Sequence, residues 1–231
     1  PLDVAFNEHG DLFTFDADME WVVGCPWYMP NRVLHIVPGA DYGWRRGTGR
    51  WPAWYPDTLP SVVDIGLASP TAVTFGHGAK FPAKYQKAFY ICDWAYGRIL
   101  AVHMTQQGAS YTGTSELFVG GRPLNVTDVC IGPDGAMWFT TGGRGTQSGL
   151  YRVTYFGTEA ATAFAVKELA EAESPSGKSS RDFRHRLEGL ISSEIGRSRL
   201  PQLALLADMD QNEFRLGLGQ RDPFLSHPAR L

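Results

Sequence analysis

Short runs of alternating apolar and polar residues recur along the first two-thirds of the chain. The segments DVAFNEHGDLFTF from Asp3 and DVCIGPDGAMWFT from Asp128 share one plan: Asp-Val, an alternating strand, a polar turn with glycine, and a second strand. A third copy with a longer hairpin loop starts at Ala72. Because alternation with a period of two places every second side chain on one face, these segments predict half-buried antiparallel hairpins.

Each predicted hairpin is followed by one more alternating strand: RVLHIV from Arg32, GRILAVHM from Gly97 and GLYRVTY from Gly149. A hairpin with an outer strand, repeated at this spacing, is typical of a β-propeller blade. The sequence therefore predicts a mainly β fold, a partial β-propeller with about three four-stranded antiparallel blades over residues 1–157. Three blades do not close a ring, so we expect the missing blades to precede Pro1. The alternative is a β-sandwich with irregular loops.

After Phe156 helical spacing replaces alternation. The run SPSGKSS is typical of a linker, and we expect residues 158–180 to be one. Residues 181–231 then predict the start of an α-helical, HEAT-like repeat region that is cut short at its C-terminus. Four apolar residues fall on one face of its first helix: Phe183, Leu187, Leu190 and Ile191. The basic residues of the same segment predict a solvated face: Lys178, Arg181, Arg184 and Arg186.

The composition is that of a globular, turn-rich protein, with 43% hydrophobic residues, 26 Gly and 15 Pro. A formal net charge of −3 gives no electrostatic reason to expect a nucleic acid or an anionic membrane as a partner. No apolar stretch approaches the roughly 18–20 residues that span a bilayer. Cys25, Cys92 and Cys130 form no CxxC pair, so the sequence leaves their disulfide state open.

Three carboxylates alternate at the end of the second predicted strand: Asp16, Asp18 and Glu20. If the strand stays extended they share one face, and converging carboxylate oxygens are the ligands that Ca²⁺ requires. We predict that they form a metal site and, with Arg32, line the mouth of a central channel. The alternative is a solvated acidic loop at the end of a blade.

Aromatic residues with nearby arginines crowd the segment that follows. Stacked rings and guanidinium groups suit sugar faces or planar cofactors. We predict that four of these residues bind substrate: Trp27, Tyr28, Trp44 and Arg45. The alternative for most aromatic residues of this segment is packing between blades. Further along, Trp94 is predicted on the rim of the channel.

The chain resembles the sorbosone-dehydrogenase-like branch of the soluble quinoprotein glucose dehydrogenase propellers. The elements ADYGWR, FPAKY and DGAMWF occur in the order of that family, and the resemblance covers about the first two-thirds of the sequence. It implies a six-bladed propeller that binds pyrroloquinoline quinone (PQQ) with calcium. In related exported proteins, described as membrane-bound dehydrogenases, HEAT-like repeats and a c-type cytochrome domain follow the propeller. This chain has no CxxCH motif for haem.

The resemblance also bears on the cofactor. PQQ carries three carboxylates, which arginine and lysine bind best. The family's lysine falls at Ala95 and its two arginines at Asn125 and Thr127, so all three basic residues are absent. Nearby side chains are candidates to substitute, and the predicted cofactor-binding residues are Arg32, Trp94, Arg98 and Arg144. The family's histidine base falls upstream of Pro1, so no catalytic residue is predicted here.

By resemblance, the expected function is that of a propeller module in an exported or periplasmic dehydrogenase. Such a protein acts on a sugar, a sugar aldehyde or a related alcohol and passes electrons to a downstream cytochrome. The absent basic residues favour an alternative, a non-catalytic scaffold that binds carbohydrate and a partner. A third reading, lactonase-type hydrolysis, uses the acidic cluster. The expected partners are a carbohydrate-like ligand and the remaining blades and helical repeats of the same protein.

Overall fold

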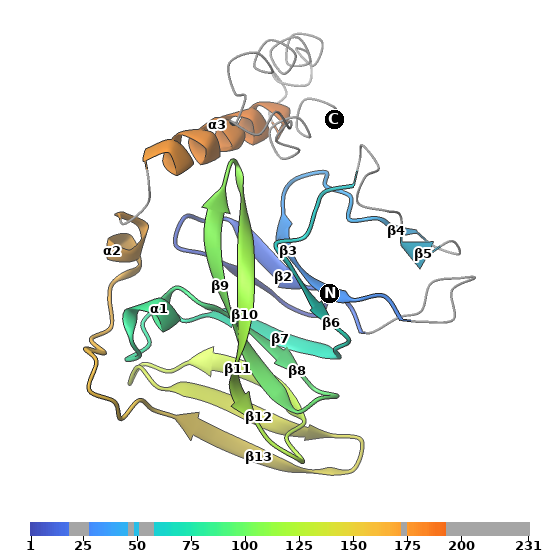
Figure 1. Cartoon of the computed structure of the whole chain (residues 1–231), viewed down its shortest axis with the longest axis vertical. Helices are drawn as coiled ribbons and strands as arrows, with labels where there is room; N and C mark the ends of the chain where they lie inside the picture. The colour runs from blue at the N-terminus through green and yellow to red at the C-terminus, as the bar shows by residue number, and fades with distance from the viewer. Residues whose placement is uncertain (19–27, 46–48, 51–57, 172–174, 193–231) are drawn as a thin grey trace. The chain divides into compact units, whose positions relative to one another are not determined.

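The structure is a computed structural model that describes residues 1–18, 28–45, 49–50, 58–171 and 175–192 (Figure 1). By its contacts the chain divides into two units, and each is considered by itself. The first unit holds residues 1–36, 61–105 and 112–172, and the second holds residues 37–60, 106–111 and 173–231. Within the described ranges, no helix is both long enough and apolar enough to cross a membrane.

Sheet 1 is antiparallel and has four strands in the order β1-β2-β3-β6. The strands are β1 (Val4–Phe6), β2 (Leu12–Phe15), β3 (Asn31–Ile36) and β6 (Val63–Gly66). The first three are the hairpin and the following strand that alternation predicts. Aromatic and β-branched residues fill them, as suits a pleated and half-buried surface. The fourth strand, β6, was not located from the sequence.

Sheet 2 repeats this plan in the order β10-β9-β8-β7. Its strands are β7 (Pro70–Phe75), β8 (Phe89–Asp93), β9 (Arg98–Gln107) and β10 (Ser110–Gly120). The longer hairpin loop predicted for this copy is present, and it contains the short helix α1 (Ala83–Gln86). Sheet 3 is antiparallel with three described strands, β11 (Val126–Ile131), β12 (Met137–Gly143) and β13 (Thr146–Val153).

The turns of the first hairpins in sheets 1 and 3 have the same hydrogen bonds. In sheet 1 the amide of Asn7 donates to the carbonyl of Asp11 and the amide of Gly10 to Asn7. In sheet 3 the amide of Gly132 donates to Ala136 and that of Gly135 to Gly132. Gly10 and Gly135 have φ values of 82° and 79°, a left-handed conformation that glycine adopts without steric cost. The left-handed backbone conformation therefore explains why glycine recurs at this place in the repeated turn.

The three sheets of the first unit contact one another through their first strands. β7 lies between β1 and β11, and it contacts both (Figure 1). Buried residues of sheets 2 and 3 form one apolar cluster that includes Tyr90, Cys92, Ile99, Val129 and Phe139. Three antiparallel sheets arranged side by side are consistent with part of a propeller, and they are not the two facing sheets of a sandwich.

After β13 the chain returns to α1 and is held there by two buried or half-buried side chains. Gln86 donates through Nε2 to the carbonyl oxygens of Phe81 and Thr162, both at 2.8 Å, and its Oε1 accepts from the amide of Phe164. Lys87 Nζ donates to the carbonyl oxygen of Leu169 in the helix α2 (Val166–Glu171) at 2.8 Å. We call residues 157–171 the return segment.

The second unit contains the short pair β4 (Trp44–Arg45) and β5 (Gly49–Arg50), the tip of the β9–β10 hairpin and the helix α3 (Pro175–Ser192). Helix α3 corrects the expected linker over 158–180, because it begins at Pro175 and α2 also lies in that range. The prediction that the basic residues form a solvated face is wrong for Arg184, which is only 2% exposed. Its Nε donates to the carbonyl oxygen of Ala109, and its Nη1 lies 2.7 Å from Glu188. Arg181 is buried as well.

Candidate functional site

One end of sheets 2 and 3 gathers the loops on which the cofactor was predicted. Pairing places Pro70, where β7 starts, opposite Asp93, where β8 ends. In sheet 3 it places Val126, where β11 starts, opposite Thr141 near the end of β12. The loops that enter β7 and β11 therefore lie beside the loops that leave β8 and β12. We call this the Trp94 end.

Trp94 ties sheet 2 to sheet 3 at this end. Its indole Nε1 donates to the carbonyl oxygen of Gly142 at 2.7 Å, and its own carbonyl oxygen accepts from Asn125 Nδ2 at 3.0 Å. The guanidinium carbon of Arg144 lies 5.1 Å from the centroid of the Trp94 ring, within the range of a cation–π contact. Arg144 has φ 47°, the left-handed region in which a side chain other than glycine is strained.

Arg98 is engaged in an ion pair at the same end. Its Nε lies 2.7 Å from Oδ2 of Asp93, whose side chain is fully buried, and its Nη2 donates to the carbonyl oxygen of Leu67. Asp93 Oδ1 also accepts from the amides of Ser69 and Tyr96. The pair therefore fixes the loop after β8 to the entry of β7, and this use leaves little of the Arg98 guanidinium for a ligand.

Sheet 1 contains an equivalent ion pair between an arginine and a buried aspartate. Arg32, at the start of β3, lies with its Nε 3.0 Å from Oδ2 of Asp16, just after β2, and both side chains are buried. Asp93 and Arg98 occupy similar places at the end of β8 and at the start of β9. Arg32 Nη2 has no hydrogen-bond partner among the described residues. Arg32 is thus placed by a buried carboxylate that is part of the fold.

The strand β2 ends before the predicted metal ligands. β2 ends at Phe15, Asp16 is bound to Arg32, and Asp18 is exposed at a bend. Glu20 lies outside the described residues. Among the residues that the structure describes, no group of three His, Cys, Asp or Glu side chains could hold a metal ion. The calcium site stays a prediction.

The side chains of two of the four predicted substrate-binding residues, Tyr28 and Trp44, are described. Trp27 lies outside the described residues, as does the side chain of Arg45. Tyr28 is exposed in the first unit, whereas Trp44 belongs to the second unit, where the Arg50 guanidinium lies 5.7 Å from its ring. These four residues therefore stay predictions, and the described site rests on Trp94, Arg98 and Arg144.

The residues of the Trp94 end do not fit PQQ. Asn125 donates to the Trp94 carbonyl oxygen, and Thr127 Oγ1 lies 2.8 Å from Thr140 Oγ1, so both polar side chains are used within the fold. Arg98 is paired with Asp93. Of the two arginines predicted to bind the cofactor at this end, Arg144 is the one that no described carboxylate binds, and it lies over Trp94. The guanidinium of Arg144 alone does not match the three carboxylates of PQQ.

Sequence reasoning missed the partners of Trp94. The run GGRG from Gly142 lies between two strands and does not lead into a helix, so it does not have the form of a phosphate-binding loop. Gly143 has φ 92°, a conformation that favours glycine, and a Cβ added there would be in van der Waals contact with Trp94 Nε1 at 3.4 Å. Glycines at the end of a strand are a signal that a large side chain approaches the backbone there.

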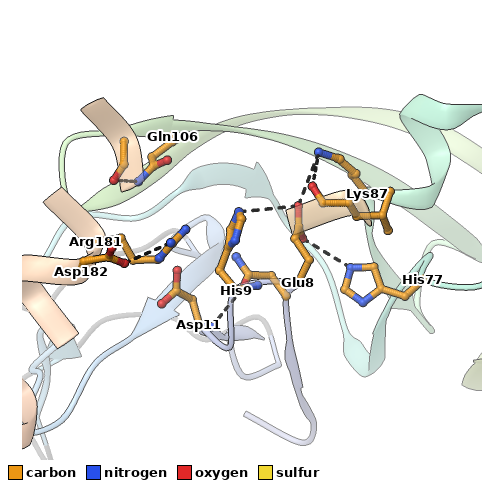
Figure 2. A network of polar contacts seen from close by, with 11 residues as sticks. Glu8, His9, Asp11, His77, Lys87, Gln106, Arg181 and Asp182 are labelled. Carbon is orange, nitrogen blue, oxygen red and sulfur yellow. Dashed lines mark hydrogen bonds and ion pairs between the residues drawn. The ribbon is translucent and has the colours of Figure 1, made fainter. Parts of the chain in front are cut away.

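A second polar cluster lies around Glu8, in the turn between β1 and β2 (Figure 2). Glu8 Oε2 lies 3.4 Å from His77 Nε2, and Oε1 lies 3.9 Å from both Lys87 Nζ and His9 Nε2. Burial acts to raise the pKa of Glu8, but the close contact with His77 and the charge of His9 outweigh it, so the pKa is lowered. This cluster joins the β1–β2 turn to the loops around α1.

A third cluster lies on the outer strands of sheet 2. Glu116 Oε1 of β10 accepts from His103 Nε2 of β9 at 2.8 Å and from Lys84 Nζ of α1 at 3.2 Å. The hydrogen bond from His103 is the main cause that lowers the pKa of Glu116 to about 2. The cluster is half-exposed and ties α1 to the outer strands.

The two described cysteines differ in exposure: Cys92 is buried and Cys130 is exposed. Cys92 and Cys130 are free thiols, and Cys25 lies outside the described ranges. Burial raises the pKa of Cys92 far above its ordinary value, which keeps the thiol protonated and unreactive.

Comparison with solved structures finds glucose dehydrogenases. An oxidoreductase (glucose dehydrogenase) from Thermus thermophilus is 21% identical over 65% of this chain and 44% of its own, with a TM-score of 0.50. Two further glucose dehydrogenase structures are 20% and 21% identical over 68% of this chain and 45% and 44% of theirs, with TM-scores of 0.52 and 0.54. No family model and no curated protein matches the sequence.

These likenesses show the fold. The described sheets have the glucose-dehydrogenase-like fold that the resemblance implied, and the chain spans less than half the length of these structures. Neither the helical repeats nor a cytochrome is part of the match.

Proposed function

We propose that this chain is part of a sugar-acting propeller and that its Trp94 end binds the sugar. The glucose-dehydrogenase-like fold supports the substrate class. The observation that carries the site is Trp94 between two sheets: its indole donates to the carbonyl oxygen of Gly142, its own carbonyl oxygen accepts from Asn125, and Arg144 lies beside the ring. Because an aromatic ring packs against the C–H face of a sugar while polar groups bind its hydroxyls, this arrangement suits an aldose, a sugar aldehyde or a related alcohol.

Within this proposal each side chain has one part. Trp94 offers its ring as the apolar platform, and Arg144 donates hydrogen bonds to hydroxyl or carbonyl oxygens. Arg98 and Asp93 position the loop that carries Trp94. We assign sugar recognition to these residues and no redox step, because the described residues do not fit the quinone that the family resemblance implies.

The binding proposal is tested by replacing Trp94 with alanine in the 231-residue chain. An aromatic contact is worth about 0.5–1.5 kcal/mol beyond its buried area, so we expect the Trp94→Ala variant to bind an aldose about tenfold more weakly. Calorimetric titration with a panel of aldoses measures this. Trp138 is a matched control, because Arg152 lies 5.7 Å from its ring and yet no site is assigned to it. Equal losses in Trp94→Ala and Trp138→Ala would contradict the proposed site.

Oxidation is tested in the whole gene product. Dye reduction with PQQ, Ca²⁺ and the same aldoses separates a dehydrogenase from a binding module. Sugar-dependent turnover supports the dehydrogenase, and we further propose that such a protein is exported and passes its electrons to a cytochrome. Cell fractionation and reduction of an added c-type cytochrome test these two points.

A second candidate function is a non-catalytic module that binds carbohydrate and a partner protein. The pairing of Arg98 with Asp93 and of Arg32 with Asp16 favours it, because both arginines serve the fold. This candidate predicts aldose binding that depends on Trp94 without dye reduction under any of the above conditions. No observation supports lactonase-type hydrolysis, because Asp16 of the acidic cluster forms an ion pair with Arg32.

A further inference from the structure

Among the described residues of the first unit, cations lie over aromatic rings at several places. These pairs, with distances of 4.4–5.7 Å to the ring centroid, are Lys84 over Tyr85, Arg98 over Tyr96, Arg144 over Trp94 and Arg152 over Trp138. Each distance is within the range of a cation–π contact. The pairs differ in what else binds the cation.

All of these cations except Arg144 also bind a carboxylate of the protein. The carboxylate partners, at 2.7–3.2 Å, are Glu116 for Lys84, Asp93 for Arg98 and Asp134 for Arg152. Arg144 is exposed, and no carboxylate of the described residues binds it. Stacking on a ring uses the flat face of the guanidinium, whereas its N–H donors point outward in the plane of the group. The donors of Arg144 are therefore open to an anion from a ligand.

The turn that carries Arg144 holds it in a costly conformation. Arg144 has φ 47° and lies between Gly143 and Gly145, with φ 92° and 80°. Thr146 Oγ1 closes the turn by donating to the carbonyl oxygen of Gly143 at 2.6 Å. A side chain other than glycine is strained in this region, and such strain is concentrated at sites that bind ligands. The turn thus fixes a charged side chain at a place that favours glycine.

The charge around Trp94 is positive. Residues 93–98, 122–128 and 141–146 meet at this end, joined by hydrogen bonds of Trp94 and of Gly142. They contain three arginines and two aspartates: Arg98, Arg122, Arg144, Asp93 and Asp128. The formal net charge of the chain is −3, so the field of the whole protein does not attract an anion. A preference for an anion has to come from these local donors.

We propose that the sugar bound at the Trp94 end is an acidic one, and that Arg144 binds its anionic group, a carboxylate or a sulfate ester. The inference rests on the proposed function, because it names the class of sugar for the same site. A guanidinium presents parallel N–H donors to two oxygens of such a group. One anionic group matches the single open guanidinium of Arg144, whereas the three carboxylates of PQQ do not.

Calorimetric titration of the 231-residue chain with matched sugars tests this proposal. Glucose and glucuronate differ only at C6, where a hydroxymethyl group is replaced by a carboxylate, and glucose 6-sulfate carries a sulfate ester there. Arg144→Gln removes the charge and keeps a neutral donor. Arg122→Gln is the matched control, because it removes the same charge from an exposed arginine at the same end.

We expect at least one of the two acidic sugars to bind about tenfold more tightly than glucose, the effect of one charge-assisted contact. Arg144→Gln should weaken that acidic sugar about tenfold and glucose about threefold at most, while Arg122→Gln should change either by about threefold at most. The acidic sugar that binds more tightly identifies the anionic group. Equal losses in Arg144→Gln and Arg122→Gln would overturn the proposal, because the preference would then come from the general charge of this end.

The same titrations separate this proposal from the proposed function. If glucose binds in a way that depends on Trp94 and neither acidic sugar binds more tightly, the acidic-sugar proposal fails and sugar binding stands. If an acidic sugar binds more tightly but Trp94→Ala binds it as well as the parent does, the proposed site fails and the acidic-sugar proposal fails with it. If none of the three sugars binds, both are wrong.

Arg144→Gly covers the case in which Arg144→Gln disturbs the turn. Glycine adopts φ 47° without steric cost, so this variant keeps the backbone of the turn. We expect it to lose the preference for the acidic sugar while its midpoint of thermal unfolding stays at or above that of the parent. A clearly lowered midpoint would assign Arg144 to the stability of the turn and would overturn the proposal.

Discussion

Buried polar side chains in this protein tie together segments that are far apart in the sequence. Asp93 is the best example, since its carboxylate binds Arg98 and the amides of Ser69 and Tyr96. Asp16 holds Arg32 in the same way in sheet 1. At the scale of single residues, the charges at the proposed sugar-binding end are therefore mainly structural. Arg144 is the exception that a ligand can use.

The contribution of the Asp93 contacts to the free energy of unfolding should be measurable. We expect Asp93→Asn to lower the free energy of unfolding by about 1–3 kcal/mol, because it removes the charged partner of Arg98 and leaves buried polar groups poorly satisfied. Urea unfolding measures the change. Asp134→Asn is the matched control: its pair with Arg152 is half-exposed, and such pairs contribute about 0.2–1 kcal/mol. A loss in Asp93→Asn no larger than in the control would show that the tie is unimportant.

The pKa of Glu116 predicts a pH dependence at the same scale. Its pKa is about 2 in the folded protein, against 4.5 for the ordinary group, chiefly because His103 donates a hydrogen bond to it. Since the folded pKa is depressed, the stabilisation is present above about pH 4.5 and is lost as the pH falls towards 2.

Glu116→Gln measures this contribution. We expect the variant to be slightly less stable than the parent at pH 7 and equally stable near pH 2, by urea unfolding at each pH. The difference at pH 7 should be below about 1 kcal/mol, because Glu116 is half-exposed and solvent screens the pair. A difference that grows on acidification would refute the assigned cause.

At the scale of elements, α1 is the anchor of the return segment. Gln86 is fully buried, and its amide makes three hydrogen bonds that no other residue type reproduces at this place. Because Gln86 lies in the loop between β7 and β8, the chain that follows β13 is fastened back to sheet 2. This contact stabilises the unit without touching the Trp94 end.

Gln86→Leu tests the anchor. The variant keeps the side-chain volume but leaves the carbonyl oxygens of Phe81 and Thr162 and the amide of Phe164 without their partner. We expect a loss of about 1–3 kcal/mol and faster hydrogen exchange at the amides of residues 160–170. Lys87→Met removes a single, half-exposed donor and should have a smaller effect. Unchanged exchange in the Gln86→Leu variant would mean that the return segment is held by other contacts.

At the scale of the whole molecule, the three sheets stack in chain order, and each covers the next. Repeats of this kind gain stability from each interface between neighbours, so a sheet with one open apolar face is stabilised by a further neighbour. The glucose dehydrogenase structures are more than twice as long as the matched region, since this chain spans 44–45% of them. The match therefore covers less than half of each of these structures, and the sugar-acting function stays a proposal.

The sequence predicted the hairpins because alternation with a period of two is a local property that follows from strand geometry. The polar-Gly turns around Gly10 and Gly135 were predicted for the same reason, since only a few residues decide a tight turn. The outer strands β6 and β10 were not located. Their side chains alternate weakly, because one edge strand has little to bury. Helix α3 began earlier than predicted, since the composition of SPSGKSS is typical of a linker.

What the sequence determined alone was the kind of element at each repeat and the residues that form its apolar face. The tertiary structure decided which polar groups meet. Arg98 was predicted to bind a cofactor, but strand register brings it to Asp93; Arg184 was predicted to face solvent, but it lies against the carbonyl of Ala109. Local patterns are set by neighbours along the chain, whereas the partner of a charge is set by the packing of segments that the sequence keeps apart.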